Sequence, residues 1–157
     1  MENFSAGAAE MKLTYKILGF ETEDLLDILK QLAREIGVVH IAYVRFGSNR
    51  SLDSSLLSSV VTFPPEWLRR YFVKQYFLID PILQYALKPS LRQFDWEDLL
   101  RENPATKDFF ADAVRHKVGS NGISIPVRNR KNSHAIVSFT SEMPRSDWES
   151  FKDTKHG

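Results

Sequence analysis

Residues 122–140 read GISIPVRNRKNSHAIVSFT, and this stretch decides what kind of fold the chain has. Two runs rich in Ile, Val, Ser and Phe, at 122–127 and 134–140, flank the polar segment RNRKNS. β-branched and aromatic residues favour strands, and a short polar segment between two such runs is typical of a hairpin. The stretch therefore predicts two antiparallel strands.

A second pair of this kind lies earlier in the chain. Residues 38–46 (VVHIAYVRF) and 55–63 (SLLSSVVTF) are both β-rich, and a turn-like segment follows the first run. An amphipathic helix is predicted over 21–36, because its apolar residues recur at intervals of three and four and Gly37 follows as a stop. We expect this helix to pack on the sheet.

The segment between the two pairs predicts mainly helix, and prolines mark the starts. Pro65 and Pro81 are placed where proline is tolerated, in the first turn, and Asn103 before Pro104 is a further start signal. We expect helices over 66–78, 81–87 and 103–117, a short strand within 91–96, and a last, short helix capped by Ser146.

This order of elements predicts an α/β (α+β) fold, with an antiparallel sheet of four or five strands and helices packed against it. Connections of hairpin length exclude a doubly wound parallel sheet. We expect residues 1–20 to be loosely ordered and residues 21–157 to form a single domain.

The composition excludes several classes of function. The 157 residues carry 21 Lys plus Arg against 20 Asp plus Glu, so the net charge of +1 gives little of the positive field that draws in nucleic acid. The chain has no cysteine, which excludes disulfides and thiolate chemistry. It also lacks an apolar run of the roughly 20 residues that cross a membrane, and a signal peptide. We expect a cytoplasmic protein with no membrane partner.

No pattern in the chain predicts catalysis or a metal site. The motifs GxSxG, GxGxxG and GxxxxGK[ST] do not occur. Asp95, Glu97 and Asp98 gather on a polar stretch that favours a solvated surface. No metal-binding spacing links the histidines, His40, His116, His134 and His156. We therefore expect no enzyme, no catalytic residue, no metal and no cofactor, and an enzymatic function is the weakest hypothesis.

Aromatic residues crowd between positions 63 and 110, which suits either a large core or an apolar ligand pocket. Trp67 and Tyr71 are four residues apart on one helical face, and Asp80 follows at a proline joint. An aspartate among apolar neighbours needs hydrogen-bond donors, either from the backbone or from a ligand amide. The Trp indole donates hydrogen bonds, the carboxylate accepts them, and the Tyr hydroxyl can do either. These side chains therefore suit a ligand with a carbonyl, an amide and an apolar tail.

The same residues permit a structural interpretation. Asp80 can cap the helix that opens at Pro81, while Trp67 and Trp96 fill the core. The residue pattern leaves both interpretations open.

A family resemblance favours the ligand interpretation. Residues 63–96 and 122–126 resemble the autoinducer-binding domain of LuxR-type quorum-sensing regulators, which bind N-acyl-homoserine lactones. The resemblance covers about residues 20–150 and implies an α-β-α sandwich with a central antiparallel sheet of about five strands and helices on both faces. The matching positions are an aromatic residue and a proline, Trp67, Tyr71, Asp80, Pro81, Phe94, Asp95, Trp96 and Gly122.

The resemblance also implies roles for these residues. Trp67 would donate from its indole to the lactone carbonyl, and Asp80 would accept the amide N–H of the ligand. Tyr71 would line the site near the acyl chain, and Trp96 would pack against the lactone ring. Pro81 and Gly122 would be structural, and the domain would contribute to a homodimer.

This sequence departs from the family at Phe63, where a tyrosine hydroxyl commonly bonds the acyl carbonyl. Ser138 falls where the family often places a Ser or Thr that bonds the same carbonyl, and we expect it to compensate. Phe72 or Phe77 could shorten the pocket. The apolar sleeve for the acyl group is expected to include Ile41, Tyr43, Leu57, Val60, Leu68, Tyr76, Leu83 and Val137.

Family members continue into a helix-turn-helix domain that reads DNA, and the sequence stops before such a domain begins. Residues 146–157 resemble the start of the interdomain linker, so we expect the sensing part of a longer regulator that contacts DNA only through that further domain. The alternative is a receptor-like interaction module without an output domain, which acts by forming heterodimers with full-length relatives.

Overall fold

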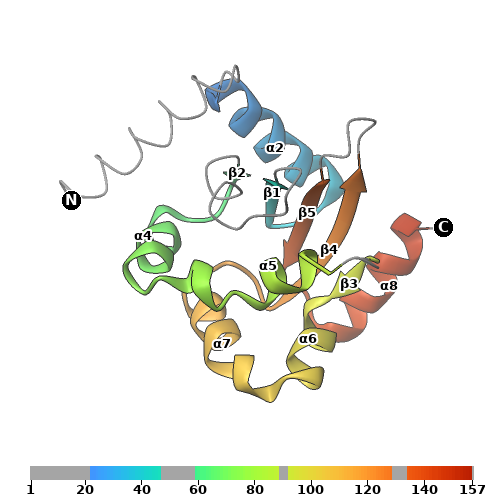
Figure 1. Cartoon of the computed structure of the whole chain (residues 1–157). Helices are drawn as coiled ribbons and strands as arrows, with labels where there is room; N and C mark the ends of the chain where they lie inside the picture. The colour runs from blue at the N-terminus through green and yellow to red at the C-terminus, as the bar shows by residue number, and fades with distance from the viewer. Residues whose placement is uncertain (1–21, 47–58, 89–91, 129–133, 157) are drawn as a thin grey trace.

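A computed structural model describes residues 22–46, 59–88, 92–128 and 134–156 (Figure 1). The segment at 1–20 that we expect to be loosely ordered lies outside the described residues. Five strands form one antiparallel sheet in the order β2-β1-β5-β4-β3, so both predicted strand pairs are confirmed. The strands are β1 (His40–Phe46), β2 (Ser59–Val61), β3 (Phe94–Asp95), β4 (Asn121–Arg128) and β5 (His134–Ser141).

Helices cover both faces of the sheet, as the α-β-α sandwich predicts (Figure 1). Helices α2 (Thr22–Ile36) and α8 (Arg145–His156) pack on one face through an apolar cluster. The other face is covered by α4 (Pro65–Val73), α5 (Pro81–Ala86), α6 (Trp96–Glu102) and α7 (Lys107–Arg115). We call these the α2/α8 face and the α4–α7 face. Among the described helices, none is long and apolar enough to cross a membrane.

The strand register assigns side chains to these faces, because successive residues of a strand point to opposite sides. One row across the sheet faces α4–α7 and consists of Val61, Ala42, Ser138, Ser124 and Phe94. The adjacent row faces α2 and α8 and consists of Ile41, Phe139, Ile123 and Asp95.

The helix predicted over 66–78 is broken in the structure. Helix α4 ends at Val73, and Gln75 adopts a left-handed conformation with φ 56° before the 3₁₀ turn η2 (Tyr76–Leu78). Left-handed geometry in a residue with a side chain cannot continue a right-handed helix. The break brings Tyr76 back against Trp67, with 5.5 Å between the ring centroids.

Other helix boundaries also differ from expectation. The polar stretch after β3 forms α6, because Asp95 caps it by accepting from the backbone N–H of Glu97 at 2.8 Å. The helix predicted over 103–117 is a 3₁₀ turn, η3 (Pro104–Thr106), followed by α7. The last helix is longer than expected, since α8 spans 12 residues, begins at Arg145 and buries Trp148 completely.

Candidate functional site

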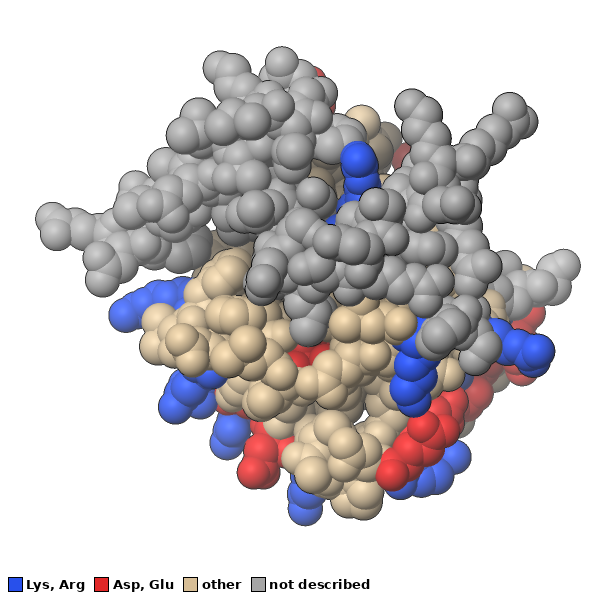
Figure 2. Space-filling view, in the orientation of Figure 1, with Lys and Arg blue, Asp and Glu red and all other residues tan. Residues whose placement is uncertain are grey.

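A cavity of about 90 Å³ lies between the sheet and the helices of the α4–α7 face. Its wall is mostly apolar, with Asp80 as its acidic residue and Ser138 as a buried hydroxyl. Figure 2, in the orientation of Figure 1, shows mostly uncharged side chains on this part of the molecule, with a small acidic spot among them and charged side chains around the edge. The lining residues are Ala42, Val44, Ser59, Val61, Phe63, Trp67, Leu68, Tyr71, Phe72, Asp80, Ile82, Leu83, Trp96, Phe109, Ala113, Val118, Ile136 and Ser138.

Trp67 and Tyr71 reach the cavity from one face of α4, as their spacing of four predicts. Trp67 is buried, and aromatic rings fix its indole: the centroid of Phe109 lies at 5.9 Å and that of His116 at 5.8 Å. The indole N–H is therefore a hydrogen-bond donor that ring packing fixes in the wall of the cavity.

Asp80 caps a helix and also lines the cavity. Its Oδ1 accepts from the backbone N–H of Ile82 at 2.9 Å and caps α5, which begins at Pro81. Its Oδ2 accepts from the Tyr71 hydroxyl at 2.7 Å, and the side chain lines the cavity. Burial raises the pKa of Asp80 to about 6, although these hydrogen bonds oppose the rise, and burial beside Asp80 also raises the pKa of Tyr71.

The other polar part of the wall belongs to a chain of three hydrogen-bonding side chains, in which Trp96 and Ser138 line the cavity and Ser124 lies behind them. The Trp96 indole donates to Ser124 Oγ at 2.9 Å, and Ser124 Oγ lies 2.6 Å from Ser138 Oγ. Ser124 faces Ser138 across the β4–β5 ladder. Gly122 makes room for the indole, because a Cβ atom there would lie 2.2 Å from the Trp96 ring. The structural role expected for Gly122 thus has a steric cause.

Phe63 and Leu83 also line the cavity, and so do Leu68 and Phe72. The Phe63 ring packs edge-on against His40, with 5.7 Å between centroids. The His40 ring bridges Thr62 Oγ1 at 3.1 Å and the carbonyl of Lys117 at 3.0 Å, and burial lowers its pKa. The missing hydroxyl at Phe63 leaves this side of the wall apolar.

A family model described as the autoinducer binding domain matches residues 21–156. The chain belongs to this family. It is the domain found in LuxR-type quorum-sensing regulators, which confirms the resemblance seen in the sequence.

Curated relatives agree with this assignment. VjbR of Brucella ovis, an HTH-type quorum sensing-dependent transcriptional regulator, is 31% identical over 136 residues, which are 82% of this chain and 52% of VjbR. The transcriptional activator RaiR of Rhizobium etli is 28% identical over 116 residues, 72% of this chain and 48% of RaiR. The chain therefore spans about half the length of these relatives.

Solved structures share the fold. Escherichia coli SdiA aligns with a TM-score of 0.57 at 16% identity, over 97% of this chain and 63% of SdiA. SdiA in complex with octanoyl-rac-glycerol gives the same TM-score over 92% of this chain and 57% of SdiA. A third structure is CepR2 of Burkholderia cenocepacia, an N-acylhomoserine lactone dependent LuxR family transcription factor. It aligns with a TM-score of 0.55 at 20% identity, over 77% of this chain and 70% of CepR2. At these identities the likeness concerns the fold alone.

Four of the expected sleeve residues do not reach the cavity of this autoinducer-binding domain. They occupy the strand positions that point away from Ser138 and Ala42, so they face α2 and α8 instead. Their placement corrects the expected sleeve, and Leu57 lies outside the described residues. The four are Ile41, Tyr43, Val60 and Val137.

Tyr76 also stands outside the cavity wall, behind Trp67. Its hydroxyl donates to Oδ2 of the buried Asp112 at 2.5 Å, and the Arg70 guanidinium pairs with the same oxygen. Burial alone would raise the pKa of Asp112, but the hydrogen bonds from Arg70 and Tyr76 hold it below its usual range. Tyr76 thus ties η2 to α7 and supports the Trp67 ring from outside the cavity.

The sequence did not single out Ser124 or the inner strand residues Ala42, Val44 and Ile136. Alternation along β5 could have identified Ile136, two residues before Ser138, whereas Ser124, Ala42 and Val44 are placed on the same side of the sheet only by the register between strands.

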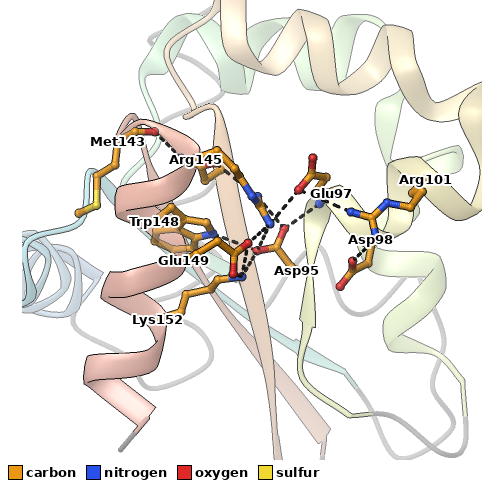
Figure 3. Close-up of polar contacts among 10 residues, drawn as sticks. Asp95, Glu97, Asp98, Arg101, Met143, Arg145, Trp148, Glu149 and Lys152 are labelled. Atoms are coloured by element: carbon orange, nitrogen blue, oxygen red, sulfur yellow. Dashed lines mark hydrogen bonds and ion pairs between the residues drawn. The ribbon is translucent and has the colours of Figure 1, made fainter.

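Asp95 is not part of a solvated acidic surface, which corrects the expectation for this position. It is buried on the α2/α8 face and accepts from the Trp148 indole at 2.9 Å, from Lys152 Nζ at 2.6 Å and from Arg145 at 3.1 Å (Figure 3). Glu97 and Asp98 are exposed, as expected. The described residues contain no group of three or more His, Cys, Asp or Glu that could hold a metal ion.

Proposed function

We propose that this domain is the sensor of a quorum-sensing transcription regulator and that it binds an N-acyl-homoserine lactone in the cavity of the α4–α7 face. One observation carries the proposal. A mostly apolar cavity presents the Trp67 indole donor, the Asp80 carboxylate acceptor and the Ser138 hydroxyl.

These groups match the polar atoms of an acyl-homoserine lactone one by one. Asp80 accepts the amide N–H of the ligand. Its Oδ2 can accept a second hydrogen bond, because the Tyr71 hydroxyl occupies only one of its two lone pairs. Trp67 donates to the lactone carbonyl, and Ser138 bonds the acyl carbonyl in place of the hydroxyl that Phe63 lacks. Trp96 packs against the lactone ring, and the acyl chain lies against the apolar wall, to which Leu68 and Leu83 belong.

The size of the cavity links binding to folding. A cavity of about 150 Å³ holds benzene, so the 90 Å³ present here admits an acyl-homoserine lactone only when wall side chains move. Phe72 is the freest candidate, because it lines the cavity and is 44% exposed. A ligand that then fills the core stabilises the folded state by mass action. We propose that ligand binding in this way controls folding and homodimerisation of a cytoplasmic receptor, which is not an enzyme and contacts DNA through a further domain.

Two octanoyl compounds with the same acyl chain provide the test. Octanoyl-homoserine lactone has the amide N–H that Asp80 accepts, and octanoyl-rac-glycerol, the ligand of the SdiA structure, lacks it. We expect Asp80→Asn to weaken lactone binding by about 10- to 150-fold, the range for a hydrogen bond to a charged group, and to affect the glycerol ester less. Isothermal titration calorimetry measures both dissociation constants.

Asp98→Asn is the matched control, because Asp98 is an exposed carboxylate outside the cavity. It should leave both constants unchanged. If no acyl-homoserine lactone of any chain length binds or raises the melting temperature of the wild-type domain, the sensor proposal is wrong. The interaction module that forms heterodimers with full-length relatives is then the surviving function.

A further inference from the structure

The hydroxyl pair of Ser124 and Ser138 is the polar feature of the cavity that the proposed function does not fully use. The two residues are directly opposite each other on β4 and β5, and their oxygens are 2.6 Å apart. Ser124 is fully buried behind the wall, whereas Ser138 lines the cavity. The Trp96 indole reaches Ser124 from the other side.

The direction of the bond between the serines follows from counting protons. An indole N–H only donates, so Ser124 Oγ accepts from Trp96 and retains one proton of its own. If Ser138 donated to Ser124, that proton would have no acceptor among the described residues, in a fully buried position. An unsatisfied buried donor carries a desolvation cost. The favoured order is therefore Trp96 to Ser124 to Ser138.

This order leaves the Ser138 proton facing the cavity, where a ligand can accept it. We infer that Ser124 is a positioning residue, which sets the Ser138 hydroxyl as a donor and so makes this part of the cavity specific for a carbonyl oxygen of the ligand. The inference rests on the proposed function, because the carbonyl in question is the acyl carbonyl of the lactone. Ser124 itself does not touch the ligand.

The experiment compares octanoyl-homoserine lactone with its thioamide analogue, in which sulfur replaces the acyl carbonyl oxygen. Sulfur is the weaker acceptor, so the ratio of the two dissociation constants reports the bond from Ser138. We expect Ser138→Ala to reduce the preference for the oxygen ligand by about fivefold, the worth of a neutral hydrogen bond. Ser124→Ala should reduce it by about two- to threefold, because the Ser138 hydroxyl then samples three staggered positions instead of one.

The double variant separates positioning from general damage. If Ser124 acts through Ser138, then Ser124→Ala combined with Ser138→Ala gives the same ratio as Ser138→Ala alone. Ser141→Ala is the control, since Ser141 is a buried serine on β5 that accepts from the backbone N–H of Met143 away from the cavity. It should leave the ratio at the wild-type value.

Several outcomes would overturn the inference. An unchanged ratio in Ser124→Ala, or additive losses in the double variant, would show that Ser124 does not set the Ser138 hydroxyl. If Ser124→Ala does not fold, Ser124→Cys replaces it, and a weak thiol donor predicts a ratio between those of wild type and Ser138→Ala. Failure of the wild type to bind either ligand would instead contradict the proposed function.

Discussion

Two buried aspartates begin two short helices of this domain, and they differ in almost everything beyond that. Asp80 caps α5 and Asp95 caps α6, each by accepting the backbone N–H two residues ahead through its Oδ1, at 2.9 and 2.8 Å. Asp80 lies at the cavity on the α4–α7 face. Asp95 lies on the α2/α8 face against the last helix.

The difference lies in the partners of the second oxygen. Oδ2 of Asp95 accepts from an indole and from Lys152, and Arg145 lies 3.1 Å from it. Oδ2 of Asp80 accepts one hydroxyl, from Tyr71, and no cation pairs with it among the described residues. Burial acts to raise the pKa of both carboxyl groups, and at Asp80 the net result is a raised pKa. At Asp95 the hydrogen bonds from Lys152, Glu97, Trp148 and Arg145 outweigh burial, so the net result is a lowered pKa.

The comparison shows how the same local motif serves two purposes. A carboxylate whose lone pairs are all used holds structure together, whereas one with unused acceptor capacity beside a cavity is available to a ligand. The sequence around each aspartate does not reveal which case applies, because the deciding partners of Asp95 are more than 45 residues away.

The largest effect is expected from removing the fully paired aspartate. Asp95→Ala leaves Lys152, Arg145 and the Trp148 indole without their acceptor and should lower the free energy of unfolding by about 2–4 kcal/mol, a value reduced for the partial exposure of the two cations. Asp80→Ala loses a cap but also removes an unpaired buried charge, so about 1 kcal/mol or less is expected. Urea denaturation at neutral pH measures both, and equal losses would break the comparison.

The pH dependence of stability should have opposite signs at the two positions. The pKa of Asp80 is about 6 in the folded state and near 3.8 when unfolded, so between these values the folded state holds a proton that the unfolded state lacks. This group therefore stabilises the fold increasingly as pH falls from about 6 to about 4, by up to about 3 kcal/mol. Asp95, whose pKa is lowered, contributes stability above the ordinary pKa and loses it as pH falls further.

Asp80→Asn isolates the first of these effects. Unfolding of the ligand-free variant and wild type is compared at several pH values between 4 and 7. Relative to wild type, the variant should gain stability as pH rises from about 4 to about 6, and the difference should level off above pH 6. A constant difference across this range would mean that Asp80 is ionised throughout, like Asp95.

Gly122→Ala tests the wall behind the cavity with a smaller effect. The new Cβ would lie 2.2 Å from the Trp96 ring, so the indole must move away from Ser124 at a cost of about 1–3 kcal/mol. The Asp95 cluster on the opposite face should remain intact. Thermal unfolding gives the cost, and the chemical shift of the Trp148 indole proton, which Asp95 accepts, reports on the cluster. Stability equal to that of the wild type would show that the Trp96 ring can move aside without a cost in free energy.

The smallest effect is expected at Phe63. Phe63→Tyr restores a hydroxyl in the cavity wall, and a new bond to the acyl carbonyl would improve lactone affinity by up to about fivefold. Affinity equal to wild type is consistent with Ser138 already serving that carbonyl. A clear loss, measured by calorimetry, would show that the ring edge is packed too tightly to accept an oxygen.

Much of the fold could be predicted from sequence because its strands are local and strongly β-prone. The runs HIAYVRF and HAIVSFT became β1 and β5, and prolines placed the starts of α4 and α5. Helix α8 was underestimated, since Trp148 and Phe151 are its only apolar residues and the polar contact that adds to their packing is made with a distant aspartate.

The site was partly predictable for the same reason. Trp67, Tyr71 and Asp80 were identifiable because they lie on adjoining elements with fixed spacing. The inner strand residues were misassigned at Ile41 and Tyr43, because β1 is apolar on both sides and alternation alone does not say which side faces the cavity. Register with Ser138 supplies that information, and register is a tertiary property.

The contacts between Asp95 and α8 decide how short a fragment of this domain can be. Asp95 and Trp96 are consecutive, and their side chains point to opposite faces, one toward α8 and the other into the cavity wall. A fragment that ends before Lys152 would therefore leave a buried carboxylate next to the residue expected to meet the lactone ring. Ligand screening needs a fragment that extends beyond Lys152, even though the described residues that line the cavity include none from α8.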